Sequence, residues 1–344
     1  MTPKASSSYS PTAGLPFDDE ELESKLVWIW GSPRSGSTWL LELLCHPFQM
    51  DPKSQIGFKW REGWGGTVPA LPVNEFQIGA HLAPGIYGDS AGDATVEDDG
   101  GTVLPRTLNR VTDYFASYAF SDAYADVWRP EARRMTLVRL YAVIERARDA
   151  GLSIPPELPL LAIKEVNGSH AADLVMPLFG RSRMIFLVRD GRDVLDSIVD
   201  ANSSGGWLTK RKWGPTGFES AEERLEFVRE NARKWTARMN ACTAAYEEHD
   251  PKLRVKVRYE DLLADTAAQL GELERWLGLP AGPKRMESIA AQHAFEAVPE
   301  RGRGPGKLRR AATPGSWRDG LTAAEQDVAN EAMAETLAEL GYER

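Results

Sequence analysis

The chain has 344 residues, of which 42% are hydrophobic and 26% are charged, a composition typical of a folded globular protein. Its net charge of -9, from 41 basic and 50 acidic side chains, argues against a general nucleic-acid binder, which carries a basic excess. The two cysteines, Cys45 and Cys242, lack metal-ligand spacing and favour a reducing compartment. No apolar run approaches the ~18 residues that span a bilayer, so we expect a cytoplasmic protein without a membrane span.

Residues 1–24 are expected to form a disordered tail, because the first sixteen are rich in Ser, Pro and Ala, and residues 25–344 to form one domain. Four apolar runs have the character of strands: Leu26–Trp30, Leu158–Ile163, Met184–Val188 and Leu253–Val257. Helical periodicity covers Met135–Ala150, Ala221–Glu248 and Thr322–Leu340. This alternation predicts an α/β fold, a three-layer sandwich with a central parallel sheet.

A phosphate-binding loop is predicted directly after the first strand. Residues 31–38 (GSPRSGST) combine a strand, a glycine-bounded loop and a helix, an arrangement that aims backbone N–H groups at a phosphate. The glycine spacing is that of a P-loop, with Thr38 at the hydroxyl position, but Ser37 occupies the lysine position and Arg34 is the only cation. The alternative is a tight turn that merely joins a strand to a helix.

A second basic segment follows the third strand. Arg189 lies at the carboxyl end of that strand, where open α/β sheets bind ligands. Asp190 or a neighbour can cap a helix that carries Ser197 two turns on, so Arg189 and Ser197 are predicted to converge on one anion. The alternative is a set of surface ion pairs between Arg192 and the neighbouring aspartates. Two phosphate sites at adjacent strand ends suit a nucleoside that carries phosphate at both ends.

With these motifs the chain resembles the sulfotransferases that use 3′-phosphoadenosine 5′-phosphosulfate (PAPS). Residues 33–39 (PRSGSTW) are similar to the family's 5′-phosphosulfate loop, 259–262 (YEDL) to its adenine-side segment, and 315–318 (GSWR) to the end of its C-terminal loop. The resemblance implies sulfuryl transfer to a hydroxyl of a small molecule or glycan, release of PAP and no metal. The residues that it places around PAPS are Arg34, Ser35, Gly36, Ser37, Thr38, Trp39, Arg189, Ser197, Tyr259, Arg309, Arg310 and Trp317.

Two departures from the family pattern affect the site. The cytosolic members carry Arg-Lys-Gly before the C-terminal tryptophan, whereas this chain has 307–310 (KLRR), which leaves open whether Arg309 or Arg310 reaches the 3′-phosphate. Lys164 matches the family's transition-state lysine, but Val166 stands where those members carry a histidine base.

Catalysis is therefore assigned to Arg34 and Lys164 as positive charges and to Glu75 as the base. Glu75 lies in the segment after the first helix, where some bacterial and tyrosine-modifying sulfotransferases resemble this chain in carrying a glutamate. Rival bases are Glu165, His81 and His170, and Glu75 also fits a solvated loop carboxylate.

Three irregular segments complete the prediction. Loops 51–110 and 203–217 are expected to bind the acceptor, and the basic segment 299–320 to order as a lid over the nucleotide, unless it is a solvated, mobile loop. The competing functions are a degenerate P-loop nucleotide kinase or hydrolase, which needs Mg²⁺ and the missing lysine, and a non-catalytic nucleotide-binding protein. The acceptor and the oligomeric state are not readable from the sequence.

Overall fold

A five-stranded parallel sheet forms the centre of the protein, in the order β4-β7-β1-β8-β9. The computed structural model describes residues 17–50, 58–60, 70–74, 76–82, 95–97, 103–105, 122–152, 159–210 and 216–343. The strands of the sheet are β1 (Leu26–Gly31), β4 (Ala70–Asn74), β7 (Leu160–Lys164), β8 (Arg183–Val188) and β9 (Arg254–Arg258).

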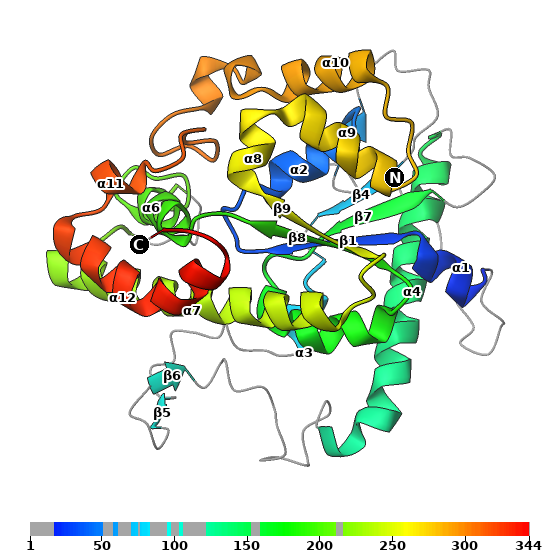
Figure 1. Ribbon diagram of the computed structural model, residues 1–344, viewed down its shortest axis with the longest axis horizontal. Helices are drawn as coiled ribbons and strands as arrows, with labels where there is room; N and C mark the ends of the chain where they lie inside the picture. The colour runs from blue at the N-terminus through cyan, green and yellow to red at the C-terminus, as the bar shows by residue number, and fades with distance from the viewer. Residues whose placement is uncertain are drawn as a thin grey trace, which may run out of the picture.

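Helices cover both faces of this sheet (Figure 1). On one face lie α2 (Ser37–Leu44), α8 (Tyr259–Ala264) and α9 (Thr266–Trp276), and on the other lie α5 (Ala172–Val175) and α7 (Ala221–Glu248). All six residues of β1 are buried, which is why the strand is a continuous apolar run without polar alternation. The predicted three-layer α/β sandwich is confirmed.

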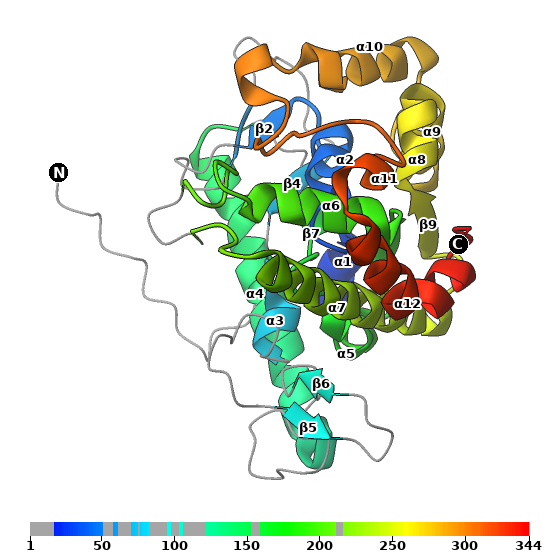
Figure 2. The same ribbon diagram turned by 90° about the vertical axis from the view of Figure 1, so that its left-hand side faces the viewer.

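Two further helices lie beyond the carboxyl ends of the strands. α6 (Gly191–Asn202) follows β8 directly, and Asp190 caps it by accepting a hydrogen bond from the backbone N–H of Arg192 at 2.9 Å. α11 (Trp317–Gly320) packs against α6, as Figure 2 shows. The C-terminal helix α12 (Ala323–Glu339) packs against both α6 and α7. α6 therefore occupies the edge of the sheet at which the sequence places its ligand.

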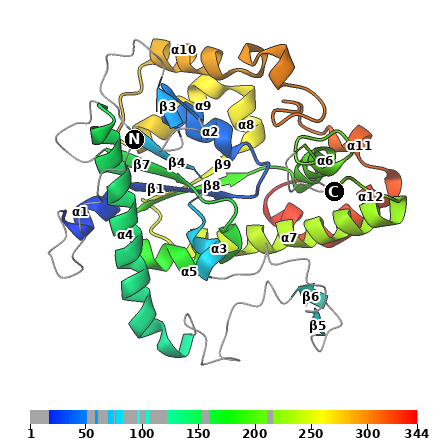
Figure 3. The same cartoon turned by 180° about the vertical axis from the view of Figure 1, so that it is seen from behind.

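Helix α4 (Ala125–Asp149) runs along the opposite side of the molecule, next to α1 (Asp19–Ser24) (Figure 3). Arg133 of α4 binds the Glu23 carboxylate of α1 at 2.6 Å, and Leu22 is fully buried. The sequence assigned residues 19–24 to a disordered tail, and the structure corrects that assignment, because a cap, an ion pair and an apolar contact hold this short helix to the domain.

Shorter elements connect these layers. Two small antiparallel sheets pair β2 with β3 and β5 with β6. The remaining elements are β2 (Phe48–Met50), β3 (Phe58–Trp60), α3 (Ile78–Leu82), β5 (Thr95–Glu97), β6 (Val103–Pro105), α10 (Pro283–His293) and the 3₁₀ turns η3 (Asp122–Tyr124), η4 (Ser169–Ala171), η5 (Met176–Phe179), η6 (Phe295–Ala297) and η7 (Glu300–Gly302).

The start of α6 gives a test of this packing. A Cβ atom on Gly191 would lie 2.7 Å from the Trp235 ring of α7 and 2.9 Å from the Met333 sulfur of α12. Gly191→Ala is expected to lower the free energy of unfolding by about 1–3 kcal/mol through overpacking, measured by denaturant titration. Gly180→Ala is the matched control, because a Cβ there meets no atom within 4 Å. Equal stability of the two variants would contradict the packing.

Candidate functional site

The loop between β1 and α2 has the backbone that an anion site requires. The first intrahelical bond of α2 joins Leu40 N to Gly36 O at 3.0 Å, and no described side chain caps the helix. The first N–H groups of α2 therefore lack intrahelical acceptors. Gly36 has φ 91°, and a Cβ there would lie 2.6 Å from the Tyr259 ring, so only glycine fits between the loop and that ring.

Buried polar atoms without partners gather around this loop. Ser35 is fully buried and Ser32 is 2% exposed, yet neither hydroxyl has a hydrogen-bond partner among the described residues. The same holds for Nε of Arg189, which is 8% exposed. Unsatisfied buried polar groups are costly and rare, and a cluster of them next to a helix N-terminus indicates a ligand that completes their hydrogen bonds.

The two predicted basic segments meet at this point. Arg189 lies over the Tyr259 ring at 4.4 Å and donates from NH1 to the carbonyl oxygen of Arg34 at 2.9 Å. Arg34 donates from Nε to the Ser197 hydroxyl at 2.9 Å. Ser197 thus binds the loop arginine in this structure, whereas the sequence paired it with Arg189. The neighbouring residues Asp190 and Arg192 form a buried ion pair of their own at 2.8 Å.

Burial and the Arg189 guanidinium, with a smaller effect of Arg310, lower the pKa of Arg34 to about 10. Arg34 keeps its charge at neutral pH, and after desolvation the repulsion from the positive charges of Arg189 and Arg310 accounts for part of the lowered pKa. An anion placed among them removes that repulsion. The site is therefore electrostatically prepared for a negatively charged ligand.

Lys164 supplies a further cation at the end of β7. Its Nζ donates to the hydroxyl of Thr38 in α2 at 3.0 Å, and the residue is 5% exposed. β7 pairs with β1, so this lysine lies beside the loop whose own lysine position holds Ser37. The amine thus binds the hydroxyl that in a nucleotide hydrolase helps to hold a metal ion.

Of the two glutamates considered as the base, the structure describes only Glu165. Glu75 lies outside the described residues, although Asn74 before it pairs in register with Lys164 at the strand ends. Glu165 is fully buried and accepts hydrogen bonds from the backbone N–H groups of Gln77 at 2.6 Å and Gly79 at 3.0 Å. Its carboxylate thereby fixes the start of α3.

The two histidine candidates remain predictions. His170 is buried in η4, and His81 lies in α3, with its side chain outside the described part of the structure.

Two aromatic side chains flank the loop on the side of α10. Trp39 and Tyr259 meet edge to face with ring centroids 5.9 Å apart. The indole N–H of Trp39 donates to the carbonyl oxygen of His293 at 2.9 Å, at the end of α10. This bond fixes the tryptophan between α2 and the segment that leads to the lid.

The C-terminal segment is held to α6 by a row of carboxylates. Asp193, Asp196 and Asp200 follow one another at intervals of three and four residues and so share one face of the helix. Asp193 accepts from the backbone N–H of Trp317 at 3.1 Å, and Asp200 from that of Gly306 at 2.9 Å. Trp317 is buried and stacks on the Arg192 guanidinium at 4.3 Å. The lid residues are therefore anchored at two separate points.

The two lid arginines point to different partners. Arg309 pairs with Glu42 of α2 at 2.5 Å. Arg310 pairs with Asp196 and lies 3.8 Å from Asp200, and its charge acts on Arg34. Arg310 is thus the lid arginine that belongs to the cation cluster. The carbonyl of Leu308, the residue before Arg309, accepts from Nη2 of Arg34 at 2.7 Å, which links segment 299–320 to the loop.

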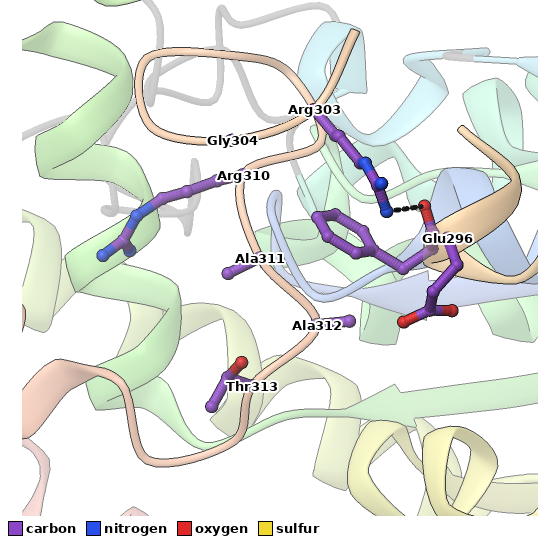
Figure 4. A pocket seen from close by; sticks show the side chains of 8 residues that line it. Glu296, Arg303, Gly304, Arg310, Ala311, Ala312 and Thr313 are labelled. Carbon is purple, nitrogen blue, oxygen red and sulfur yellow. Dashed lines mark hydrogen bonds between the residues drawn. The ribbon is translucent and has the colours of Figure 1, made fainter. Parts of the chain in front are cut away.

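A cavity of about 400 Å³ opens beside this lid (Figure 4). Arg303 lies over the Phe295 ring at 5.5 Å and donates to its carbonyl oxygen at 3.4 Å, while the Arg310 side chain turns away from the cavity toward α6. The cavity is lined by one aromatic residue, two arginines, one glutamate and four smaller residues: Phe295, Glu296, Arg303, Gly304, Arg310, Ala311, Ala312 and Thr313.

Sequence reasoning missed several members of this site. The aspartate row was readable from its spacing on a helix that the sequence already predicted. Phe295 carried no signal, because a lone aromatic residue outside a motif is usually part of a core. The ligand-facing edge thus contains both the predicted phosphate loop and a lining contributed by the lid.

A parallel sheet with a glycine-bounded anion loop at its carboxyl edge defines an α/β protein of the phosphate-loop class. The sequence matches the model of the sulfotransferase family over residues 27–283. Because this match spans most of the domain, the chain belongs to the sulfotransferase family.

Several solved structures align with this chain over most of its length. A mouse sulfotransferase, SULT7A1, complexed with PAP aligns with TM-score 0.48 at 13% identity, over 92% of this chain and 85% of that one. Retinol dehydratase in complex with androsterone and the inactive cofactor PAP aligns with TM-score 0.47 at 14% identity, over 93% and 83%. A sulfotransferase domain from the curacin biosynthetic pathway aligns with TM-score 0.41 at 17% identity, over 92% and 97%. No curated protein sequence matches this chain significantly.

The described residues contain no group of three or more His, Cys, Asp or Glu side chains that could hold a metal ion. None of the described helices is long and apolar enough to cross a membrane.

The position of Glu165 makes a testable distinction between an anchor and a base. Glu165→Gln is expected to lower the free energy of unfolding by about 1–3 kcal/mol, because it weakens two charge-assisted bonds to backbone N–H groups in a buried place. Denaturant unfolding measures this loss, and Glu247→Gln on the surface of α7 is the control. A variant with unchanged stability and abolished sulfuryl transfer would instead make Glu165 the base.

Proposed function

We propose that this protein transfers the sulfuryl group of PAPS to a hydroxyl of a small-molecule or glycan acceptor by in-line displacement and releases PAP. The observation that carries the proposal is the convergence of Arg34, Arg189 and Arg310 around a P-loop-like turn whose lysine is replaced in space by Lys164. The family supports sulfotransferase activity, and the cation cluster supports a donor with anionic groups at both ends of a nucleoside.

The two ends of the nucleotide are assigned to two parts of the cluster. We assign the 5′-phosphosulfate to Arg34 and residues 35–38, where the α2 N–H groups lack acceptors. We assign the 3′-phosphate to Arg189, Ser197 and Arg310, because Arg189 has an unpartnered buried Nε and Arg310 acts on the same cluster. Arg309 is engaged with Glu42 and plays no part in this assignment.

The adenine is assigned to the aromatic side of the loop. Trp39 and Tyr259 offer ring faces next to the phosphate groups, and Phe295 lines the neighbouring cavity of about 400 Å³. That volume falls within the range of small-ligand pockets, about 300–1,000 Å³. Trp317, which is buried against α6, holds the end of the lid in place.

Sulfuryl transfer forms an S–O bond to the acceptor oxygen as the S–O bond to the 5′-phosphate breaks, and the acceptor loses its proton. Negative charge then develops on the phosphate oxygen that leaves. Arg34 in the loop and Lys164 beside it stabilise this charge without rearrangement, which is the largest contribution that a fixed site makes. Glu75 accepts the proton, following the strand end that pairs with Lys164.

The acceptor is assigned to the loops 51–110 and 203–217. The described part of the second loop places Trp207 5.7 Å from the Arg34 guanidinium, so this loop reaches the reacting end of the nucleotide. An aromatic side chain at this position favours an acceptor with an apolar body around its hydroxyl.

Nucleotide binding tests the proposal directly. We expect PAP to bind in EDTA with micromolar or tighter affinity by calorimetry, and ATP with Mg²⁺ to bind at least tenfold more weakly. Arg189→Ala should weaken PAP binding about 10–100-fold through the loss of charge-assisted hydrogen bonds. Arg181→Ala, an exposed arginine at the opposite end of β8, is the control. Tighter binding of ATP with Mg²⁺ would favour a nucleotide kinase or hydrolase.

Turnover tests the assignment of the base. With ³⁵S-labelled PAPS and a panel of phenols, alcohols and glycans as acceptors, Glu75→Gln should lower kcat about 100–10,000-fold and leave PAP affinity unchanged. Glu75→Asp should retain part of the activity, because it keeps a carboxylate. Full turnover by Glu75→Gln would remove Glu75 from the reaction.

A further inference from the structure

The last turn of the chain reaches the back of the proposed nucleotide site. Tyr342, three residues after α12, is 8% exposed, and its hydroxyl donates to Oε2 of Glu260 at 2.9 Å. Oε1 of the same carboxylate accepts from the backbone N–H of Asp190 at 3.0 Å. Glu260 therefore bridges the chain terminus and the residue at the start of α6.

Each end of this bridge adjoins a proposed nucleotide contact. Asp190 follows Arg189 at the end of β8, and Glu260 follows Tyr259 at the end of β9. The Arg189 guanidinium and the Tyr259 ring lie against each other at 4.4 Å. The Glu260 carboxylate thus ties together the two strand ends that carry the pair.

The surroundings of Tyr342 hold its hydroxyl in one place. The Arg258 guanidinium lies over its ring at 4.2 Å and donates to the Leu340 carbonyl at 2.9 Å. Arg192 binds the Glu343 carbonyl at 2.8 Å. Burial and the Glu260 carboxylate raise the pKa of the Tyr342 phenol, so it stays protonated and remains a donor.

We infer that Glu260 and Tyr342 are positioning residues for nucleotide binding, acting through Arg189 and Tyr259 without touching the nucleotide. The inference rests on the proposed function, because it takes PAP as the ligand of Arg189 and Tyr259. Loss of either bond lets the residues that follow β8 and β9 shift relative to each other, and the hydrogen bonds proposed between Arg189 and the nucleotide weaken over small displacements. The reacting groups at Arg34 and Lys164 stay in place, so the effect falls on affinity and not on the chemical step.

Three variants and one matched control test this inference. Tyr342→Phe removes the hydroxyl alone, Glu260→Gln keeps the shape of the side chain, and the third variant combines them. Thr336→Val is the control: it removes a buried hydroxyl that donates to Asn240 at 3.0 Å and likewise ties the C-terminal helix to the domain.

We expect Tyr342→Phe and Glu260→Gln each to raise the Kd for PAP about five- to tenfold, less than the direct loss of a hydrogen bond to a charged group costs, because the effect reaches the nucleotide only through Arg189 and Tyr259. The Kd of the double variant should equal that of the single variant with the higher Kd, because both substitutions break the same bridge. The kcat at saturating PAPS should stay within about twofold of wild type. Thr336→Val should lower the midpoint of thermal unfolding by about as much as Tyr342→Phe does, but it should leave the Kd for PAP unchanged.

The outcomes separate the two proposals. A wild-type protein that does not bind PAP overturns the proposed function and this inference with it. If wild type binds PAP and Tyr342→Phe binds it equally well, only the inference fails. It also fails if Thr336→Val weakens PAP binding as much as Tyr342→Phe does, or if the effects of the two single variants multiply.

Discussion

The crowding of guanidinium groups is the constraint on which the carboxyl edge of the sheet depends. Arg189 is buried and Arg34 is half-buried beside it, with the half-buried Arg310 close enough to act on Arg34. Like charges in a poorly solvated environment are costly, and the fold accepts that cost at one point of the carboxyl edge. Carboxylates on α6 and the Tyr259 ring offset part of it. The remainder is available to a bound anion, and this is the physical basis of the proposed nucleotide site.

A single helix organises the response to that constraint. The N-terminal cap of α6 lies beside Arg189, Ser197 on the helix binds Arg34, and the aspartate row at 193, 196 and 200 binds the lid. The proposed phosphate contacts and the observed contacts with segment 299–320 thus come from adjacent positions of one rigid element. A shift of α6 along its axis would disturb both sets together, which explains why three neighbouring segments, α7, α11 and α12, pack against it.

The sequence predicted the sheet, the phosphate loop and the long helix α7 because each depends on local pattern. It missed β4, since Pro72 interrupts the apolar run and edge strands tolerate proline that inner strands do not. The contact of Lys164 with Thr38 joins residues far apart in the chain, so only the strand order reveals it. The choice between Arg309 and Arg310 was equally hidden, because adjacent residues differ only in the direction that the folded backbone gives them.

Arg34 illustrates what the planar guanidinium adds to this arrangement. Within the described part of the chain, Arg34 donates one of its five N–H groups to Ser197 and another to the Leu308 carbonyl. It can therefore hold loop, helix and lid together and still present donors to an incoming ligand. A lysine ammonium group has only three donors, on a flexible stem. With two of them bound to Ser197 and the Leu308 carbonyl, it could offer a ligand only one donor unless it gave up one of these two bonds. An arginine at this position therefore leaves donors for an anionic ligand while the bonds that join loop, helix and C-terminal segment stay in place.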